Sequence, residues 1–332
     1  MLLVGDIGGT HARLSLVTLR GRALRHEVFD SRKYTSLEAV AGSFLGVTPP
    51  RVVAAAFGVA GPVVNGRCTA TNLPWVIDAR VLSRKLRIRH VTLLNDLVAL
   101  ALGALLVRRS KLHVLGGAGV PKHQQGNVAV IAAGTGLGEA VLVWDGSRLV
   151  PTATEGGHSD FAPRDDLEIE LLQFLRARHG HVSCERVLSG DGLGAVYDFF
   201  RTAKRIAETA RNTRLIEAAA DRNEAIAQLG MSATSQAAAR ALDLFAAIYG
   251  GEAGNLALKS LAVGGVYVCG NIAVHLLSVL ERGGFHRAFL DKGRLTPLME
   301  KIPVAVVLDT DVGLAGATKV AMDMTRTAAK RG

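Results

Sequence analysis

Cysteine is scarce in this chain of 332 residues, and its three thiols stand far apart. Cys68, Cys184 and Cys269 form no CxxC pair. The sequence therefore gives no basis for a disulfide framework, a structural zinc site or an iron–sulfur cluster. Unpaired thiols without such a framework are typical of a reducing compartment, so we expect a cytoplasmic protein.

Long apolar runs are missing as well. The apolar stretch at residues 97–107 is far shorter than the roughly 20 residues that a transmembrane helix needs. No cationic region precedes the first apolar residues of the chain, and Asp6 interrupts them almost at once. A signal peptide has the opposite pattern. We therefore expect neither a membrane span nor a signal peptide.

Aromatic residues make up only 5% of the chain, although its formal net charge is +10. A basic cluster at residues 80–89 invites a nucleic-acid interpretation, but no aromatic residue is interleaved with its cations. Nucleic-acid surfaces that bind single strands stack bases on aromatic side chains. We expect no nucleic-acid partner and interpret the cluster as a solvated basic face that favours anionic substrates.

Half of the residues are apolar, and the length suits two domains or two lobes around a cleft. Short apolar runs punctuated by glycine alternate with longer amphipathic stretches, which predicts an α/β fold. The expected strands are residues 2–7, 13–18, 52–59, 90–94, 127–132, 139–144, 264–271 and 303–308. The expected helices are residues 36–45, 78–86, 96–107, 166–179, 192–204, 214–228, 234–249, 254–261 and 273–282, with a terminal helix after residue 311.

A strand, a glycine-rich turn and a second strand occur together twice, at residues 3–17 and 130–143. Each copy opens its own half of the chain, which indicates a duplicated lobe with one phosphate-handling hairpin per lobe. The boundary is expected near residues 108–111. We thus expect a small lobe of residues 1–109 and 312–332, and a large lobe of residues 110–311.

The first turn has the residue types of a phosphate site. Paired Gly8 and Gly9 let backbone amides approach an anion, Thr10 adds a hydroxyl donor, and Asp6 can hold Mg²⁺ through water. Arg13 follows on the second strand and is a further candidate for the nucleotide. The alternative is an ordinary Gly-Gly hairpin turn.

The second turn offers another set of backbone donors. Gly134, Gly136 and Gly138 surround Thr135, a candidate donor to the β- or γ-phosphate. No lysine follows, which excludes a Walker A loop, and the next segment is a strand rather than the helix of a dinucleotide site. Further on, Gly270 can let the backbone pass flat against an adenine ring.

The expected strand at residues 90–94 ends in Asn95 and Asp96, where sheets of this class present functional groups. Phosphoryl transfer to a hydroxyl needs in-line positioning, charge neutralisation and a carboxylate that accepts the proton. Asp96 is therefore the candidate general base, and Asn95 suits sugar hydroxyls. The alternative role for Asp96 is the N-cap of the following helix.

Three further segments suit a sugar. Glu155 and His158 bracket two glycines, an arrangement fit for vicinal hydroxyls, whereas zinc would need another nearby His or Cys. Glu185 adds a carboxylate, although it also suits a helix N-terminus. Asn72 and Trp75 lie in a proline-fixed loop that can form a sugar surface, or an exposed turn beside a core tryptophan.

Taken in this order, these segments resemble the bacterial glucokinase family, in its branch without zinc, over nearly the whole chain. The resemblance implies a two-lobed, actin-like ATPase fold of the ribonuclease H-like type, with ATP and Mg²⁺ between the lobes and a homodimer formed through the large lobe. It implies an enzyme that phosphorylates glucose on its 6-hydroxyl, with Asp96 taking the proton. The residues it places on glucose are Asn95, Asp96, Glu155, His158 and Glu185.

Two positions depart from the family pattern, and some alternatives stay open. His11 stands where asparagine is common, and Asn271 stands where a second glycine usually follows Gly270. No cysteine cluster follows His158, which disfavours the zinc-bearing branch. Fructose or mannose is an alternative acceptor, and ADP or polyphosphate an alternative donor. A sugar-responsive regulatory protein without catalysis is the competing hypothesis from another class.

Overall fold

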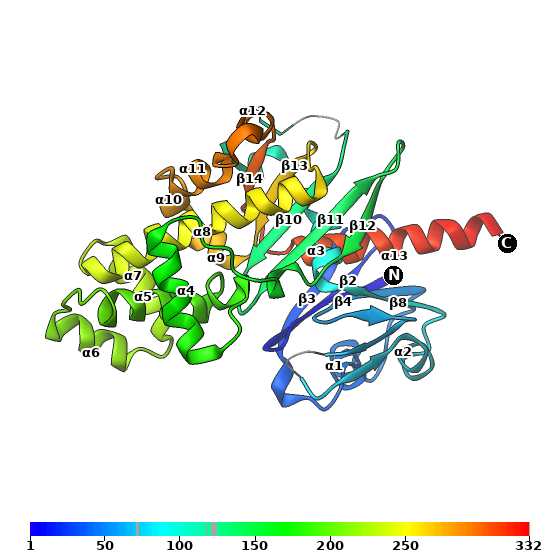
Figure 1. The fold of residues 1–332 in the computed structure, drawn as a ribbon. Coiled ribbons are helices and arrows are strands. Elements are labelled where there is room, and N and C mark those ends of the chain that lie inside the picture. The colour runs from blue at the N-terminus through cyan, green and yellow to red at the C-terminus, as the bar shows by residue number, and fades with distance from the viewer. Residues whose placement is uncertain (71–72, 118, 121–124, 332) are drawn as a thin grey trace. The chain divides into compact units, whose positions relative to one another are not determined.

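The computed structural model describes residues 1–70, 73–117, 119–120 and 125–331, and side chains up to residue 326. The chain divides into two compact units (Figure 1). Unit 1 consists of residues 1–109, 151–153 and 309–332, and unit 2 of residues 110–150 and 154–308. In the described part of the chain, no helix is both long and apolar enough to cross a membrane.

Unit 1 is built on a five-stranded sheet with the order β3-β2-β1-β4-β8. The strand β1 pairs antiparallel with β2 and parallel with β4, and β4 pairs parallel with β8. Every residue of β4 is buried, as in a central strand covered on both faces. The bounds are β1 Leu2–Ile7, β2 His11–Val17, β3 Ala23–Asp30, β4 Ala54–Val59 and β8 His90–Asn95.

Helices cover both faces of this sheet (Figure 1). One face packs on α1 and α2, and the other on α13. Helices α3 and α13 approach so closely that a Cβ on Gly103 or Gly316 would overlap the backbone of the other helix. The bounds are α1 Leu37–Leu45, α2 Ala79–Leu86, α3 Asp96–Ala104 and α13 Val312–Arg331, with a small sheet of β5 Val63–Val64, β6 Arg67–Thr69 and β7 Val76–Asp78.

Unit 2 repeats this plan in a six-stranded sheet with the order β12-β11-β10-β13-β14-β9. Five of its strands, in the order β12-β11-β10-β13-β14, are arranged like β3-β2-β1-β4-β8 of unit 1. The strand β10 pairs antiparallel with β11 and parallel with β13, as β1 does with β2 and β4, and β13 pairs parallel with β14. The prediction of a duplicated α/β core is confirmed. The bounds are β9 Leu112–Gly116, β10 Val128–Ala133, β11 Leu137–Trp144, β12 Leu149–Ala153, β13 Gly265–Cys269 and β14 Val304–Val307. The last three residues of β12 are counted with unit 1 in the division above.

The helices of unit 2 correct three sequence predictions. Residues 234–249 and 254–261 belong to one helix, α8, and residues 214–228 are two helices, α6 and α7, separated at the Asp221 N-cap. Residues 273–282 fall in the short helices α9 and α10. The bounds are α4 Asp166–His179, α5 Gly190–Thr202, α6 Ala210–Ala218, α7 Arg222–Met231, α8 Gln236–Ser260, α9 Asn271–His275, α10 Leu277–Leu280, α11 Gly284–Leu290 and α12 Thr296–Met299.

Helix α8 stays continuous through its glycines because they allow close packing. A Cβ on Gly250 would overlap the backbone of Phe285, and one on Gly254 would lie 2.8 Å from the carbonyl oxygen of Phe289. Each glycine costs helix stability in isolation. The burial of α8 against α11 outweighs that cost, so the glycines mark a packing interface and not a helix end.

Candidate functional site

The first glycine-rich turn closes the hairpin of β1 and β2. The amide of Gly8 donates to the carbonyl of His11 at 2.9 Å, so the turn itself uses this donor. The hydroxyl of Ser31 donates to the carbonyl of Gly8 at 2.9 Å, and the Ser31 amide donates to the carbonyl of Thr10. These bonds fix the loop and leave the side chain of Thr10 exposed at its tip.

Asp6 lies opposite Arg13 in the register of β1 and β2. The Arg13 Nη1 atom lies 3.1 Å from Asp6 Oδ2, and both groups are partly buried. Burial raises the pKa of Asp6, the Arg13 charge opposes that rise, and the charge of Asp311 adds to it. The sequence did not indicate that Arg13 neutralises Asp6. Burial disfavours the charged form of this carboxylate. Mg²⁺ prefers hard oxygen ligands, so the Asp6 carboxylate is suited to bind it.

The next pair of candidates follows β8. Asn95 is the N-cap of α3: its Oδ1 accepts from the amides of Leu97 and Val98 at 3.0 and 3.3 Å, and its Nδ2 donates to the carbonyl of Gly61 at 3.2 Å. The alternative that assigned this cap to Asp96 is therefore wrong. Asp96 is the first residue of the helix, and its Oδ1 accepts from the Leu97 amide at 2.9 Å.

The carboxyl ends of three parallel strands gather these groups in unit 1. Ile7 of β1, Val59 of β4 and Asn95 of β8 lie in register across the sheet. Asp6 and Asp96 therefore belong to one edge, two strands apart, as expected for functional groups of an open α/β sheet. Trp75 does not belong to this set: it is 2% exposed and its indole N–H donates to the carbonyl of Tyr34 at 3.1 Å. Its interpretation as a sugar surface is wrong, and Asn72 lies outside the described residues.

The second glycine-rich turn joins β10 to β11 in unit 2. The Gly134 amide donates to the carbonyl of Gly136 at 2.8 Å, and the Gly190 amide, at the start of α5, donates to the carbonyl of Gly134 at 2.9 Å. Gly270 follows β13 with φ +90°, and a Cβ there would lie 2.8 Å from the carbonyl of Ala133. Glycine is thus required at position 270. Asn271, which departs from the family pattern, is exposed at the start of α9.

Glu185 connects this turn to the predicted sugar residues. It lies in a 3₁₀ turn, Cys184–Arg186, and its Oε2 accepts from the Leu137 amide at 2.9 Å. A Cβ on Gly136 would overlap the same carboxylate. The other oxygen, Oε1, lies 3.9 Å from His158 Nδ1. The helix N-terminus interpretation of Glu185 understates its role, because this side chain bridges two loops that are distant in sequence.

The segment with Glu155 and His158 forms a second 3₁₀ turn, Gly156–His158, packed on β11. A Cβ on Gly156 would overlap the Glu139 carboxylate, and one on Gly157 would overlap the Leu137 carbonyl. The two glycines let the turn lie flat on the strand, with Glu155 and His158 exposed above it. The structure thus brings Glu155, His158 and Glu185 together with the second glycine turn in unit 2.

Comparison with known proteins decides the family. A family model described as glucokinase matches residues 3–324. The chain belongs to the glucokinase family. This glucokinase-family chain is 37% identical over 336 residues to the glucokinase of Nostoc sp., with 96% of this chain and 97% of the relative covered. It is 38% identical over 324 residues to the glucokinase of Marinobacter nauticus, with 96% of each covered.

Solved glucokinases share the fold of this family member. The crystal structure of a glucokinase from an Antarctic psychrotroph matches with a TM-score of 0.80 and 28% identity, over 97% of this chain and 98% of that one. The glucokinase of Balamuthia mandrillaris, solved in complex with glucose, matches with a TM-score of 0.82 over 96% and 93%. At 21% identity this second match supports the fold alone. The fold class that the resemblance implied is confirmed.

Proposed function

We propose that the protein transfers the γ-phosphoryl group of ATP to the 6-hydroxyl of D-glucose. The observation that carries this proposal is the bridge made by Glu185 in unit 2. One carboxylate accepts from Leu137 beside the glycine turn and faces His158 of the sugar segment. A phosphate-type turn and sugar-type side chains therefore form one site, as a kinase of a small hydroxyl compound requires.

On the acceptor side, Asp96 takes the proton of the 6-hydroxyl. A carboxylate in the first turn of α3 lies beside the positive end of the helix, which favours negative charge there. Glucose is recognised by hydrogen bonds to a set of amide, carboxylate and imidazole groups. This set comprises Asn72, Asn95, Asp96, Glu155, His158 and Glu185.

On the donor side, the two hairpin turns supply backbone and hydroxyl donors for the phosphates. Asp6 would hold Mg²⁺, and the ion would supply charge neutralisation at the phosphates when it is bound. Arg13 keeps Asp6 oriented through their ion pair. The nucleotide-side residues are Asp6, Gly8, Gly9, Thr10, Arg13, Gly134, Thr135, Gly136, Gly138 and Gly270.

The decisive experiment is a matrix of phosphoryl donors and sugars on the purified protein, with the product identified by its regiochemistry. We expect glucose 6-phosphate from ATP and glucose in the presence of Mg²⁺. The other combinations in the matrix test fructose and mannose as alternative acceptors, and ADP and polyphosphate as alternative donors. A matrix without any phosphorylated sugar would contradict the proposal and favour the regulatory alternative.

We also propose that the enzyme works in the cytoplasm as a homodimer formed through unit 2. The support for this assembly is the family resemblance, and light scattering from the purified protein measures it directly. A mass equal to that of one 35.0 kDa chain would overturn it.

A further inference from the structure

Two carboxyl groups are buried in unit 2 below the sugar segment. Glu139 on β11 is 2% exposed and Glu252 on α8 is 5% exposed. Among the described residues, neither Glu139 Oε1 nor Glu252 Oε1 has a hydrogen-bond partner. Buried polar atoms are normally paired, and Glu252 Oε1 has only the ion-pair contact with Lys259 Nζ at 3.6 Å, so the cluster, and Glu139 Oε1 above all, needs an explanation. The sequence showed no sign of this pair beyond two glutamates at apolar positions of their elements.

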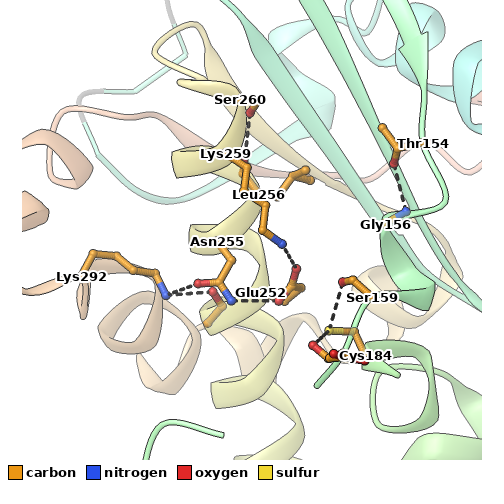
Figure 2. Close-up of polar contacts among 12 residues, drawn as sticks. Thr154, Gly156, Ser159, Cys184, Glu252, Asn255, Leu256, Lys259, Ser260 and Lys292 are labelled. Carbon is orange, nitrogen blue, oxygen red and sulfur yellow. Dashed lines mark hydrogen bonds and ion pairs between the residues drawn. The ribbon is translucent and has the colours of Figure 1, made fainter. Parts of the chain in front are cut away.

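A proton held by one of the two carboxyls provides the missing donor. Glu139 and Glu252 lie within hydrogen-bonding reach of each other. Burial, and then the charge of Glu252, raise the pKa of Glu139 to about 8. A Glu139 that keeps its proton at pH 7 can donate it to Glu252. The Glu252 carboxylate also accepts from Asn255 Nδ2 at 2.9 Å and lies 3.6 Å from Lys259 Nζ (Figure 2).

One sugar-side turn packs on Glu139, and the other carries a cysteine whose pKa responds to Glu252. The α-carbon of Gly156 packs on the Glu139 carboxylate, so closely that a Cβ would overlap it. Thr154 ties the same turn to β11, because its hydroxyl donates to the Glu139 carbonyl at 2.9 Å. The same hydroxyl accepts from the Gly156 amide at 3.2 Å (Figure 2). On the other turn, burial and the charge of Glu252 raise the pKa of Cys184 to about 12.

Cys184 is thus a neutral thiol facing the same cluster. Its Sγ donates to the carbonyl of Asp160 at 3.5 Å and lies 3.9 Å from the Ser159 hydroxyl. Cys184 immediately precedes Glu185, and Gly156 stands two residues before His158. A change of charge in the cluster therefore acts directly on the two turns that carry these side chains.

We propose that Glu139 is a positioning residue for glucose, holding the Gly156–His158 and Cys184–Arg186 turns in place through a proton that it shares with Glu252. This inference rests on the proposed function, since it concerns the sugar side of the same site. Glu139 does not touch the substrate. It acts through the backbone of the two turns.

Ionisation of Glu139 places two like charges in a closed space. The charged or titratable groups around the pair are Lys259 and Tyr249 of α8, Cys184 of the second turn and Lys292, which lies near Glu252 and Arg164. Lys259 is the cation paired with Glu252, and its side chain is 62% exposed. A largely solvated ammonium group does not compensate two buried carboxylates. The turns are therefore expected to separate as the pH rises.

The test is the KM for glucose between pH 6.5 and 9.5, measured for the wild type and Glu139→Gln. In the wild type we expect KM to rise about 10-fold with a midpoint near pH 8, while the KM for ATP stays within about twofold. Glutamine still donates to Glu252 but does not ionise, so the KM of the variant should stay flat over this range. A variant profile that follows the wild type would overturn the inference.

Controls separate positioning from folding and from the proposed function. Glu217→Gln removes the same charge from an exposed position of α6 and should leave the wild-type profile unchanged. If Glu139→Gln does not fold, Glu252→Gln is used: without the like charge, the midpoint must move to lower pH, and an unmoved midpoint contradicts the inference. Absence of glucose phosphorylation in the wild type would instead contradict the proposed function.

Thermal unfolding of the same variants gives a second readout with a definite sign. The pKa of Glu139 is about 8 in the folded chain and 4.5 as its ordinary value. Its contribution to stability is complete below pH 4.5 and is lost as the pH rises through 8. Glu139→Gln should therefore unfold about 5 °C higher than the wild type at pH 9, with a smaller gain at pH 5. An equal difference at both pH values would show that Glu139 does not titrate in this window.

Discussion

Replacing Asp96 by asparagine is expected to lower kcat by at least about 10²-fold while glucose still binds. The amide keeps the size and hydrogen-bonding reach of the carboxylate but cannot accept a proton from the 6-hydroxyl. The Asn95 cap of α3 does not depend on the Asp96 side chain, so the helix start should persist. A coupled assay measures turnover, and quenching of intrinsic fluorescence by glucose measures binding.

The matched control is Asp78→Asn, the same chemical change at the start of another helix of unit 1. Asp78 caps α2 by accepting from the amides of Arg80 and Val81 at 2.8 and 3.3 Å. Asparagine caps helices as well as aspartate does, so kcat should stay within about twofold of the wild type. Near-normal turnover in the Asp96 variant would remove this residue from the role of general base.

Adding one methyl group at Gly136 is expected to raise the KM for glucose by about 10- to 100-fold. Gly136 belongs to a phosphate-type turn, yet its Cβ position overlaps the Glu185 carboxylate. The side chain must move away, which breaks the bond from the Leu137 amide and its approach to His158. Losing a hydrogen bond to a charged group costs about 1.5–3 kcal/mol, which corresponds to this change in binding.

The matched control lies two residues earlier in the same turn. A Cβ on Gly134 would meet only the Gly136 carbonyl, at 4.0 Å. Gly134→Ala should leave the KM for glucose within about twofold, although the KM for ATP is free to change. Equal effects of the two alanines on glucose would show that Glu185 is not displaced. Steady-state kinetics with each substrate varied in turn separates these outcomes.

Local sequence patterns predicted most strands of the two central sheets on which the candidate site residues lie. The two strand, turn and strand segments were visible because glycines interrupt apolar runs, and the structure repeats one connectivity in both units. The strand β3 was missed because most of its residues are exposed and its sequence lacks an apolar run. Helix α8 was divided in two because Gly250, Gly251 and Gly254 read as breakers. Their tight contacts with other helices are tertiary, so no local pattern contains them.

The positions of the candidate site residues were partly predictable for the same reason. Asp6, Asn95 and Asp96 stand at strand ends, where polar residues after apolar runs are conspicuous. The contact of Glu185 with Leu137 joins positions 48 residues apart, and no spacing rule predicts it. Glu139 carried a usable signal: in β11 it stands two residues after buried Leu137, on a face that alternation assigns to the interior. A glutamate that alternation places on the inward face of a strand is therefore as good a candidate for a site residue as one at a strand end.

The packing of α13 on unit 1 has a consequence for the order in which the chain acquires its structure during synthesis. Leu314, Ala317 and Ala321 complete the core on one face of the first sheet, against Leu2 and Val4. A ribosome has already synthesised residues 110–308, the bulk of unit 2, before it adds these side chains. One face of β1 and β4 in unit 1 therefore stays uncovered while unit 2 is synthesised. Nascent chains stalled before residue 312 should expose that face to proteases and chaperones.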